Sequence, residues 1–215
     1  MKISIVGIAS FFAIAMAGSA LAADLTVPEA AVVPTSSPLD WSGFYVGANA
    51  GFGTGASDFT GGVGSGDFDM SGMLVGGQFG YNFHLTDGVV AGVQADLDWS
   101  NISGSDATIS DVIDWSGAVT GHIGYDVSGF MPYVLGGVAF AESTRTHTVP
   151  PESNTQTHIG WTVGAGLGVK LTDNLSAFAE YRYSDYGAKV YTYTGSPEVA
   201  LTTNAIRIGL NFHPN

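Results

Sequence analysis

The 215-residue sequence contains no cysteine and few charged side chains, and the charges that it has are mostly acidic. The absence of cysteine excludes disulfides, thiolate metal sites and cysteine nucleophiles. Six Lys and Arg residues stand against 19 Asp and Glu residues, and this balance argues against a nucleic-acid-binding protein, which needs clustered basic residues. The motifs of serine hydrolases, zinc proteases and P-loop proteins are also missing. We therefore expect no enzymatic activity and no bound cofactor.

Long apolar runs are missing too, except at the amino terminus. Residues 3–16 are almost continuously apolar and are followed by small residues. This pattern is typical of a secretory signal peptide, which we expect to comprise residues 1–22 and to be cleaved before Ala23. Residues 23–40 are rich in proline and small residues, so they are expected to form an extended periplasmic linker. Residues 41–215 remain as one domain.

Glycine and aromatic residues are abundant in this domain, and its apolar residues recur at every second position. That period is typical of β-strands. Eight such runs lie within residues 44–52, 73–83, 89–99, 115–125, 134–140, 159–171, 175–183 and 206–212.

The opposite face of each run is polar or is made of glycine. A soluble sandwich or barrel would also alternate, with its apolar face turned inward. The signal peptide, the run length of about 9–12 residues and the aromatic residues near the run ends favour the reverse arrangement. The sequence therefore predicts an all-β fold, an eight-stranded antiparallel transmembrane β-barrel with apolar side chains facing lipid and a narrow polar lumen.

The connections between the runs alternate in length. The short ones are residues 84–88, 126–130 and 172–174; the long ones are residues 53–70, 100–114, 143–156 and 185–203. This alternation indicates short periplasmic turns and long extracellular loops, with both termini in the periplasm. The long segments carry an excess of acidic residues, so we expect acidic loops outside the cell.

Charged side chains on the lumen face are the strongest candidates for a site. Because buried charges need partners, we expect a structural plug made of ion pairs, with Glu180 contacting Arg207 and with Arg182 contacting Asp96 or Asp98. The alternative is that these residues gate a narrow pore.

Four stretches of the sequence resemble a known family. They are Trp-Ser-Gly-Phe-Tyr-Val-Gly from residue 41, and residues 132–140, 181–187 and 204–212. They are similar to the small alphaproteobacterial outer-membrane β-barrel proteins, which have barrels like that of outer membrane protein A, include porin-like surface antigens and number hemin-binding proteins among their members. The resemblance implies insertion by the outer-membrane assembly machinery, which reads a last strand ending in an aromatic residue; here Phe212 is followed by three more residues.

The histidines and some acidic residues offer weaker candidates. His147 and His158 flank the third long connection and are candidate heme or metal ligands, since imidazole binds iron and zinc. The alternative is that they are solvated loop residues, as we expect for His213 in the tail. An enzymatic alternative would need Asp111, Asp114 and His158 to meet at the rim of the barrel.

The sequence thus predicts an integral outer-membrane protein with a structural or surface-interaction role. The alternatives are a heme- or metal-binding surface protein and a small diffusion pore. Its expected partners are outer-membrane lipid, the assembly machinery and an extracellular ligand or host surface, and not nucleic acid. A closed barrel has no free strand edge, so we expect a monomer.

Overall fold

The computed structural model describes residues 40–61, 64–105, 109–148, 151–190 and 198–214. The predicted signal peptide and nearly all of the linker lie outside the described residues. The described chain forms eight strands: β1 (Gly43–Gly61), β2 (Gly64–Thr86), β3 (Val89–Ser105), β4 (Ile109–Tyr125), β5 (Phe130–Thr148), β6 (Pro151–Lys170), β7 (Leu175–Val190) and β8 (Glu198–Phe212). Among these described residues, no helix is long and apolar enough to cross a membrane.

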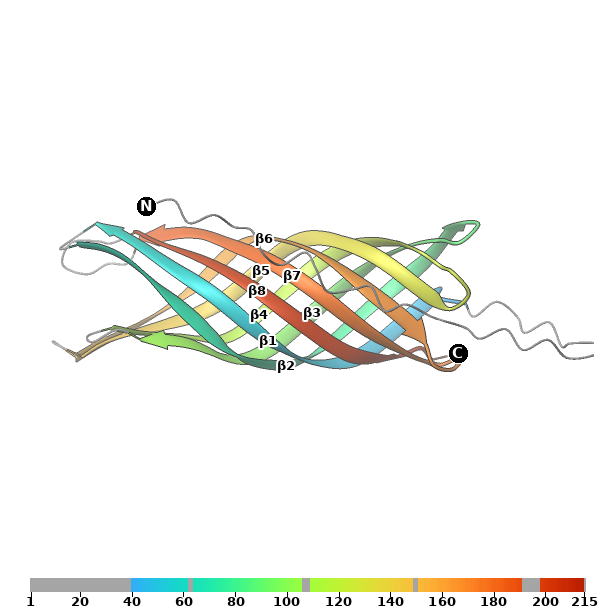
Figure 1. The fold of residues 1–215 in the computed structure, drawn as a ribbon, viewed down its shortest axis with the longest axis horizontal. Coiled ribbons are helices and arrows are strands. Elements are labelled where there is room, and N and C mark those ends of the chain that lie inside the picture. Colours follow the sequence, from blue (N-terminus) through green and yellow to red (C-terminus); the bar gives the residue numbers. More distant parts are fainter. Residues whose placement is uncertain (1–39, 62–63, 106–108, 149–150, 191–197, 215) are drawn as a thin grey trace, which may run out of the picture. The chain divides into compact units, whose positions relative to one another are not determined.

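Each strand pairs antiparallel with the next one, and β1 pairs with β8 to close the barrel (Figure 1). The predicted fold is therefore confirmed. The register of the closing pair places Gly51 opposite Arg207, so the lumen faces of the first and last strands are in phase.

The short turns also lie where the sequence places them. β2 and β3 are joined through Asp87 and Gly88, and Gly88 has a φ of 77°, in the left-handed region that glycine adopts without strain. The carboxyl end of β8 lies at this same end of the barrel, which we call the periplasmic end.

The outer face of the barrel carries large apolar side chains in the part nearer the periplasmic end. Val75, Val163 and Ile208 are 58, 46 and 61% exposed, and Trp99 is 65% exposed. Such exposure over a whole belt would be unfavourable in water, but it suits a surface in contact with lipid.

The strands are longer than the sequence predicts, and this corrects the placement of the long loops. Most of residues 53–70, 100–114, 143–156 and 185–203 is paired strand: β1 and β2, for example, pair continuously from Gly43↔Asn82 to Gly61↔Gly64. The strands have 15–23 residues, whereas about 9–11 cross a membrane. The pairs therefore continue beyond the membrane as an extension of the barrel.

The apolar alternation of the sequence does not reveal this extension, because there the apolar side chains point into the barrel and the polar ones point outward. Its buried cluster points into the barrel and contains Met70, Ile102, Ile113, Ala141, Tyr186 and Leu201, and it continues into the membrane-spanning runs with Ala118 and Ala139. Its outward residues are polar and exposed, for example Asn101, Ser103 and Thr155. Register shifts at Trp99/Ile102, Ile113/Trp115 and Asp185/Ala188 interrupt the alternation in the same region.

Candidate functional site in the barrel lumen

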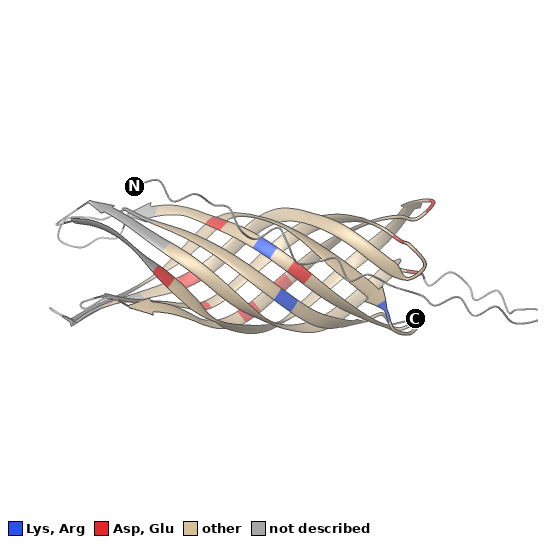
Figure 2. Cartoon of the chain, in the orientation of Figure 1, with Lys and Arg blue, Asp and Glu red and all other residues tan. Residues whose placement is uncertain are grey.

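Five charged side chains occupy the lumen at mid-height of the barrel, and they are those singled out from the sequence. β3 carries two of them, β7 another two and β8 the fifth; they are Asp96, Asp98, Glu180, Arg182 and Arg207, and we call them the ionic cluster. All five are buried. Figure 2 shows acidic and basic positions near one another in the middle of the barrel.

The cluster is joined by several charge-assisted hydrogen bonds. Arg182 Nη1 donates to both carboxylate oxygens of Asp96, at 2.9 and 3.0 Å. Arg182 Nη2 lies 2.8 Å from Glu180 Oε1. Arg207 Nη2 lies 2.9 Å from Asp98 Oδ2, and Arg207 Nη1 lies 3.6 Å from Glu180 Oε1. Arg207 therefore contacts Glu180 as expected, but its shortest contact is with Asp98.

Three carboxylates and two guanidinium groups leave the cluster with one excess negative charge if all are ionised. Neutral donors on the periplasmic side of the cluster contact its carboxylates. Tyr133 Oη donates to Glu180 Oε2 at 3.0 Å, and Gln94 Nε2 donates to Asp96 Oδ1 at 3.4 Å. Such donors stabilise buried carboxylates without adding another ion.

A layer of amides lies beside the cluster and links three strands. Asn49 Nδ2 donates to Gln78 Oε1 at 2.8 Å, and Gln78 Nε2 donates to Asn211 Oδ1 at 2.7 Å. These bonds join β1, β2 and β8 across the seam where the barrel closes.

Glycines on the lumen face make room for inward-pointing aromatic rings. A Cβ atom at Gly166 would lie 2.4 Å from Tyr133 Cζ, and one at Gly80 would lie 2.5 Å from Tyr45 Cζ. The two tyrosines can therefore lie flat against neighbouring strands and point their hydroxyl groups at Glu180 and Gln94. This pairing of glycine with an aromatic side chain is one reason why the chain is rich in both.

The periplasmic end of the lumen is closed by two residues that the sequence did not identify. Trp41, which precedes β1, is 3% exposed, and His213, which follows β8, is 6% exposed. His213 was expected to be solvated, and this was wrong: its Nε2 lies 3.0 Å from Ser176 Oγ, and its ring meets the Trp41 ring edge-on at 6.3 Å. Burial, together with the positive charge of Lys170, lowers the pKa of His213 to about 4.

Of the two candidate heme or metal ligands, His147 and His158, the structure describes the side chain of His158 alone. His158 was expected to flank a long loop, and this was wrong: it lies within β6 and is 1% exposed. It faces inward because its position in the strand has the same parity as the buried Thr162. The side chain of His147 lies outside the described part of the chain. Within the described side chains, no group of three or more His, Asp or Glu residues could hold a metal ion.

The residues of the enzymatic alternative do not converge. Asp111 and His158 are buried and face inward, whereas Asp114 is exposed and its carboxylate accepts a hydrogen bond from Thr144 Oγ1 at 2.8 Å. Asp111 and Asp114 are three residues apart on one strand, so they lie on opposite faces of the sheet.

These features together define an integral outer-membrane β-barrel: a closed eight-stranded sheet, a lipid-facing apolar belt and a charged, buried lumen. Residues 10–213 match the model of the outer membrane protein beta-barrel domain family, and the chain belongs to this family.

Its curated relatives are outer-membrane proteins of alphaproteobacteria. The 25 kDa outer-membrane immunogenic protein of Brucella abortus biovar 1 is 34% identical over 94% of this chain and 92% of the relative. The 31 kDa outer-membrane immunogenic protein of Brucella melitensis biotype 1 is 30% identical over 91 and 94%. The 22 kDa outer membrane protein of Rhizobium leguminosarum bv. viciae is 35% identical over 85 and 81%. The predicted alphaproteobacterial family is therefore confirmed.

Among solved structures, the chain is similar in fold to Neisserial surface protein A. The TM-score is 0.50 at 20% identity, over 80% of this chain and 98% of that one. At this identity the similarity concerns the fold alone.

Proposed function

We propose that this protein is a closed outer-membrane barrel with a structural and surface-interaction role, and that it does not act as a diffusion pore. The observation that carries this proposal is the ionic cluster, because its five side chains are buried and span the lumen from β3 to β7 and β8. An eight-stranded barrel has an interior only wide enough for its own side chains.

The extension supports the same proposal from the other side of the cluster. Its inward apolar residues, such as Met70 and Ile113, are 2 and 1% exposed and form a packed core above the ions. An apolar core is a second barrier to ions and polar solutes. A path along the axis would have to cross both layers.

The surface that remains for interaction is the outer wall of the extension. The described carboxylates there include Asp69 and Asp114, which are exposed, and Asp114 is linked through Thr144 to the hydroxyl group of Thr155. The curated relatives that are named immunogenic support exposure of the corresponding surface outside the cell. We propose that this wall contacts an extracellular ligand or host surface.

Planar-bilayer recording tests the closed lumen. Pure protein should give no discrete conductance steps, while a general porin in the same bilayer serves as the positive control. Reproducible unitary steps from the pure protein would contradict the proposal and favour the small pore.

The proposed location also implies removal of the signal peptide. Amino-terminal sequencing of protein extracted from outer membranes should begin at Ala23. A sequence that begins at Met1 would contradict cleavage.

A further inference from the structure

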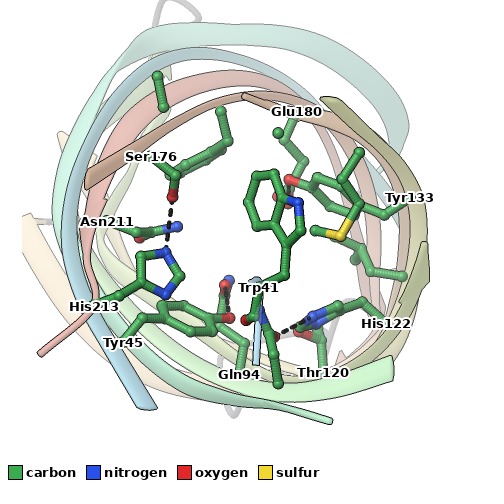
Figure 3. Close-up of a pocket in the computed structure, with 16 residues that line it drawn as sticks. Trp41, Tyr45, Gln94, Thr120, His122, Tyr133, Ser176, Glu180, Asn211 and His213 are labelled. Carbon is green, nitrogen blue, oxygen red and sulfur yellow. Dashed lines mark hydrogen bonds between the residues drawn. The ribbon is translucent and has the colours of Figure 1, made fainter. Parts of the chain in front are cut away.

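Trp41 enters the barrel from the segment that precedes β1. The chain turns at Asp40, whose carboxylate accepts hydrogen bonds from Ser42 N at 2.9 Å and Ser42 Oγ at 2.6 Å. Gly43 follows with a φ of 105°, which favours glycine. Asn82 Nδ2 then donates to the carbonyl oxygen of Trp41 at 3.0 Å. These contacts direct the indole into the lumen, where Figure 3 shows it near the middle of the cross-section.

The surroundings of the indole have the features of a built binding site. Val90 and Met131 are buried and pack with Trp41 in one apolar cluster. Lys170 Nζ lies 5.3 Å from the centre of the indole, where a cation is attracted by the ring face. Gly168 provides space, because a Cβ atom there would lie 2.9 Å from Trp41 Cη2. The wall of the barrel is thus shaped and charged for a planar aromatic ring.

A cavity of about 40 Å³ with a mixed lining adjoins the ring; the lining includes the apolar Met131 and Leu135 and the polar Gln94, Thr120 and Asn211 (Figure 3). Trp41 Nε1 and Thr120 Oγ1 are buried there without a hydrogen-bond partner in the described chain. A cavity of this size has room for water beside its polar groups. The site therefore combines an apolar slot for a ring with a polar space for a substituent.

We propose that the periplasmic mouth of the lumen is a binding site for a planar aromatic compound of the indole class, and that Trp41 is its built-in occupant. Trp41 is tethered beside the site, so its effective concentration is high and it excludes a free ligand from the intact protein. A compound with a flat aromatic ring of this size binds when the Trp41 side chain is absent. This site borders the ionic cluster, because Glu180 also lines the cavity, and it does not depend on the surface role proposed above.

The test uses the full mature chain refolded in detergent micelles, with indole as the probe. Trp41→Ala should lower the temperature of unfolding, and indole at about ten times its Kd should raise it again by about 3–5 °C. Trp99→Ala is the matched control, because it also removes one indole but from the exposed outer face. Indole should change the unfolding temperature of Trp99→Ala no more than that of the unsubstituted protein.

Two results would overturn the proposal. One is the absence of any stabilisation of Trp41→Ala by indole; the other is equal stabilisation of both variants, which indicates uptake by the micelle or the lipid-facing surface. The double variant Trp41→Ala/Gly168→Leu should lose the response, because the added side chain fills the slot from the wall.

A second measurement applies even if Trp41→Ala does not fold. Replacing the other three tryptophans by phenylalanine leaves Trp41 as the single tryptophan of the chain. Acrylamide should quench the fluorescence of Trp41 only weakly, because the residue is buried. Indole analogues that act as quenchers should leave the fluorescence unchanged, because Trp41 already occupies the site. Free access of acrylamide to this residue would contradict its place in the site.

Discussion

Two stretches of the same strand, β3, point opposite kinds of side chain into the barrel. Near mid-height Asp96 and Asp98 are buried inside while Trp99 is exposed outside; a few residues on, Ile102 is buried inside while Ser103 is exposed outside. In lipid an outward apolar residue costs nothing, so the sheltered lumen holds the polar groups. Beyond the membrane the outside is water, and the hydrophobic effect again drives apolar residues inward. The position at which the polarity reverses therefore marks the membrane surface.

The difference also determines what holds each region together. The membrane-spanning region depends on buried charges, each of which needs a partner of opposite sign, whereas the extension depends on packed apolar volume. Substitutions of buried residues in the two regions should therefore destabilise the protein for different reasons.

Removal of a charge from the ionic cluster should have the largest effect. Arg207→Met leaves three buried carboxylates with a single guanidinium group, and an uncompensated buried charge costs about 3–5 kcal/mol. The loss of stability is measured as a shift in the midpoint of urea unfolding, which is detected by the gel mobility of unboiled samples. Arg207→Met/Asp98→Asn removes an ion of each sign and should recover most of it; an unchanged midpoint for Arg207→Met alone would show that the cluster contributes nothing.

Truncation in the core of the extension should have the next largest effect. Ile102→Ala removes buried apolar volume and should cost about 2–4 kcal/mol, measured by the same unfolding assay. Ser103→Ala changes the adjacent outward residue and should alter stability by less than about 0.5 kcal/mol. Equal effects of the two substitutions would show that the extension has no packed interior.

A smaller loss of stability should follow when a methyl group is added to a glycine that packs against an aromatic ring in the lumen. Gly166→Ala places a methyl group against Tyr133 and should cost about 1–3 kcal/mol, because the ring must move away from Glu180. Gly77→Ala is the outward control, since its nearest neighbour, Gly47 O, lies 3.5 Å from the added Cβ atom. Thermal unfolding should separate the two variants, and a Gly166→Ala protein as stable as Gly77→Ala would contradict the close packing.

The last prediction concerns the pH dependence of stability at the periplasmic mouth. The pKa of His213 is about 4, below the ordinary value of about 6.5, so the folded barrel favours the neutral ring. Its contribution to stability is complete above pH 6.5 and is lost as the pH falls towards 4. His213→Gln should flatten the stability profile over that interval, and superimposable profiles for the two proteins would exclude a role for His213 protonation.

The sequence was sufficient to predict the barrel and the members of the ionic cluster. Alternation in the membrane-spanning region is strict, so the face on which Asp96, Arg182 and Arg207 lie follows from counting by twos. It was not sufficient for the partners within the cluster, because side-chain reach across the lumen decides whether Arg207 lies nearer to Asp98 or to Glu180.

Other features lie beyond such counting for physical reasons. The extension was interpreted as loops because its apolar residues are sparse, its polarity is reversed and its register shifts break the alternation. Trp41 and His213 lie outside the strands, so no strand period places them. The glycine two residues after Trp41, at position 43, is a signal for a turn, but only the fold shows that Trp41 enters the lumen.

Two single-cysteine variants on β6 would locate the reversal, and the natural absence of cysteine makes them simple to prepare. Val163→Cys and Thr155→Cys both carry an outward spin label, because they are eight residues apart on one strand. In lipid bilayers the label at 163 should collide more with oxygen than with a water-soluble nickel chelate, and the label at 155 should show the opposite preference. Nickel-chelate access at both positions, or no access of either reagent at 163, would contradict a lipid-facing apolar belt below a water-facing extension.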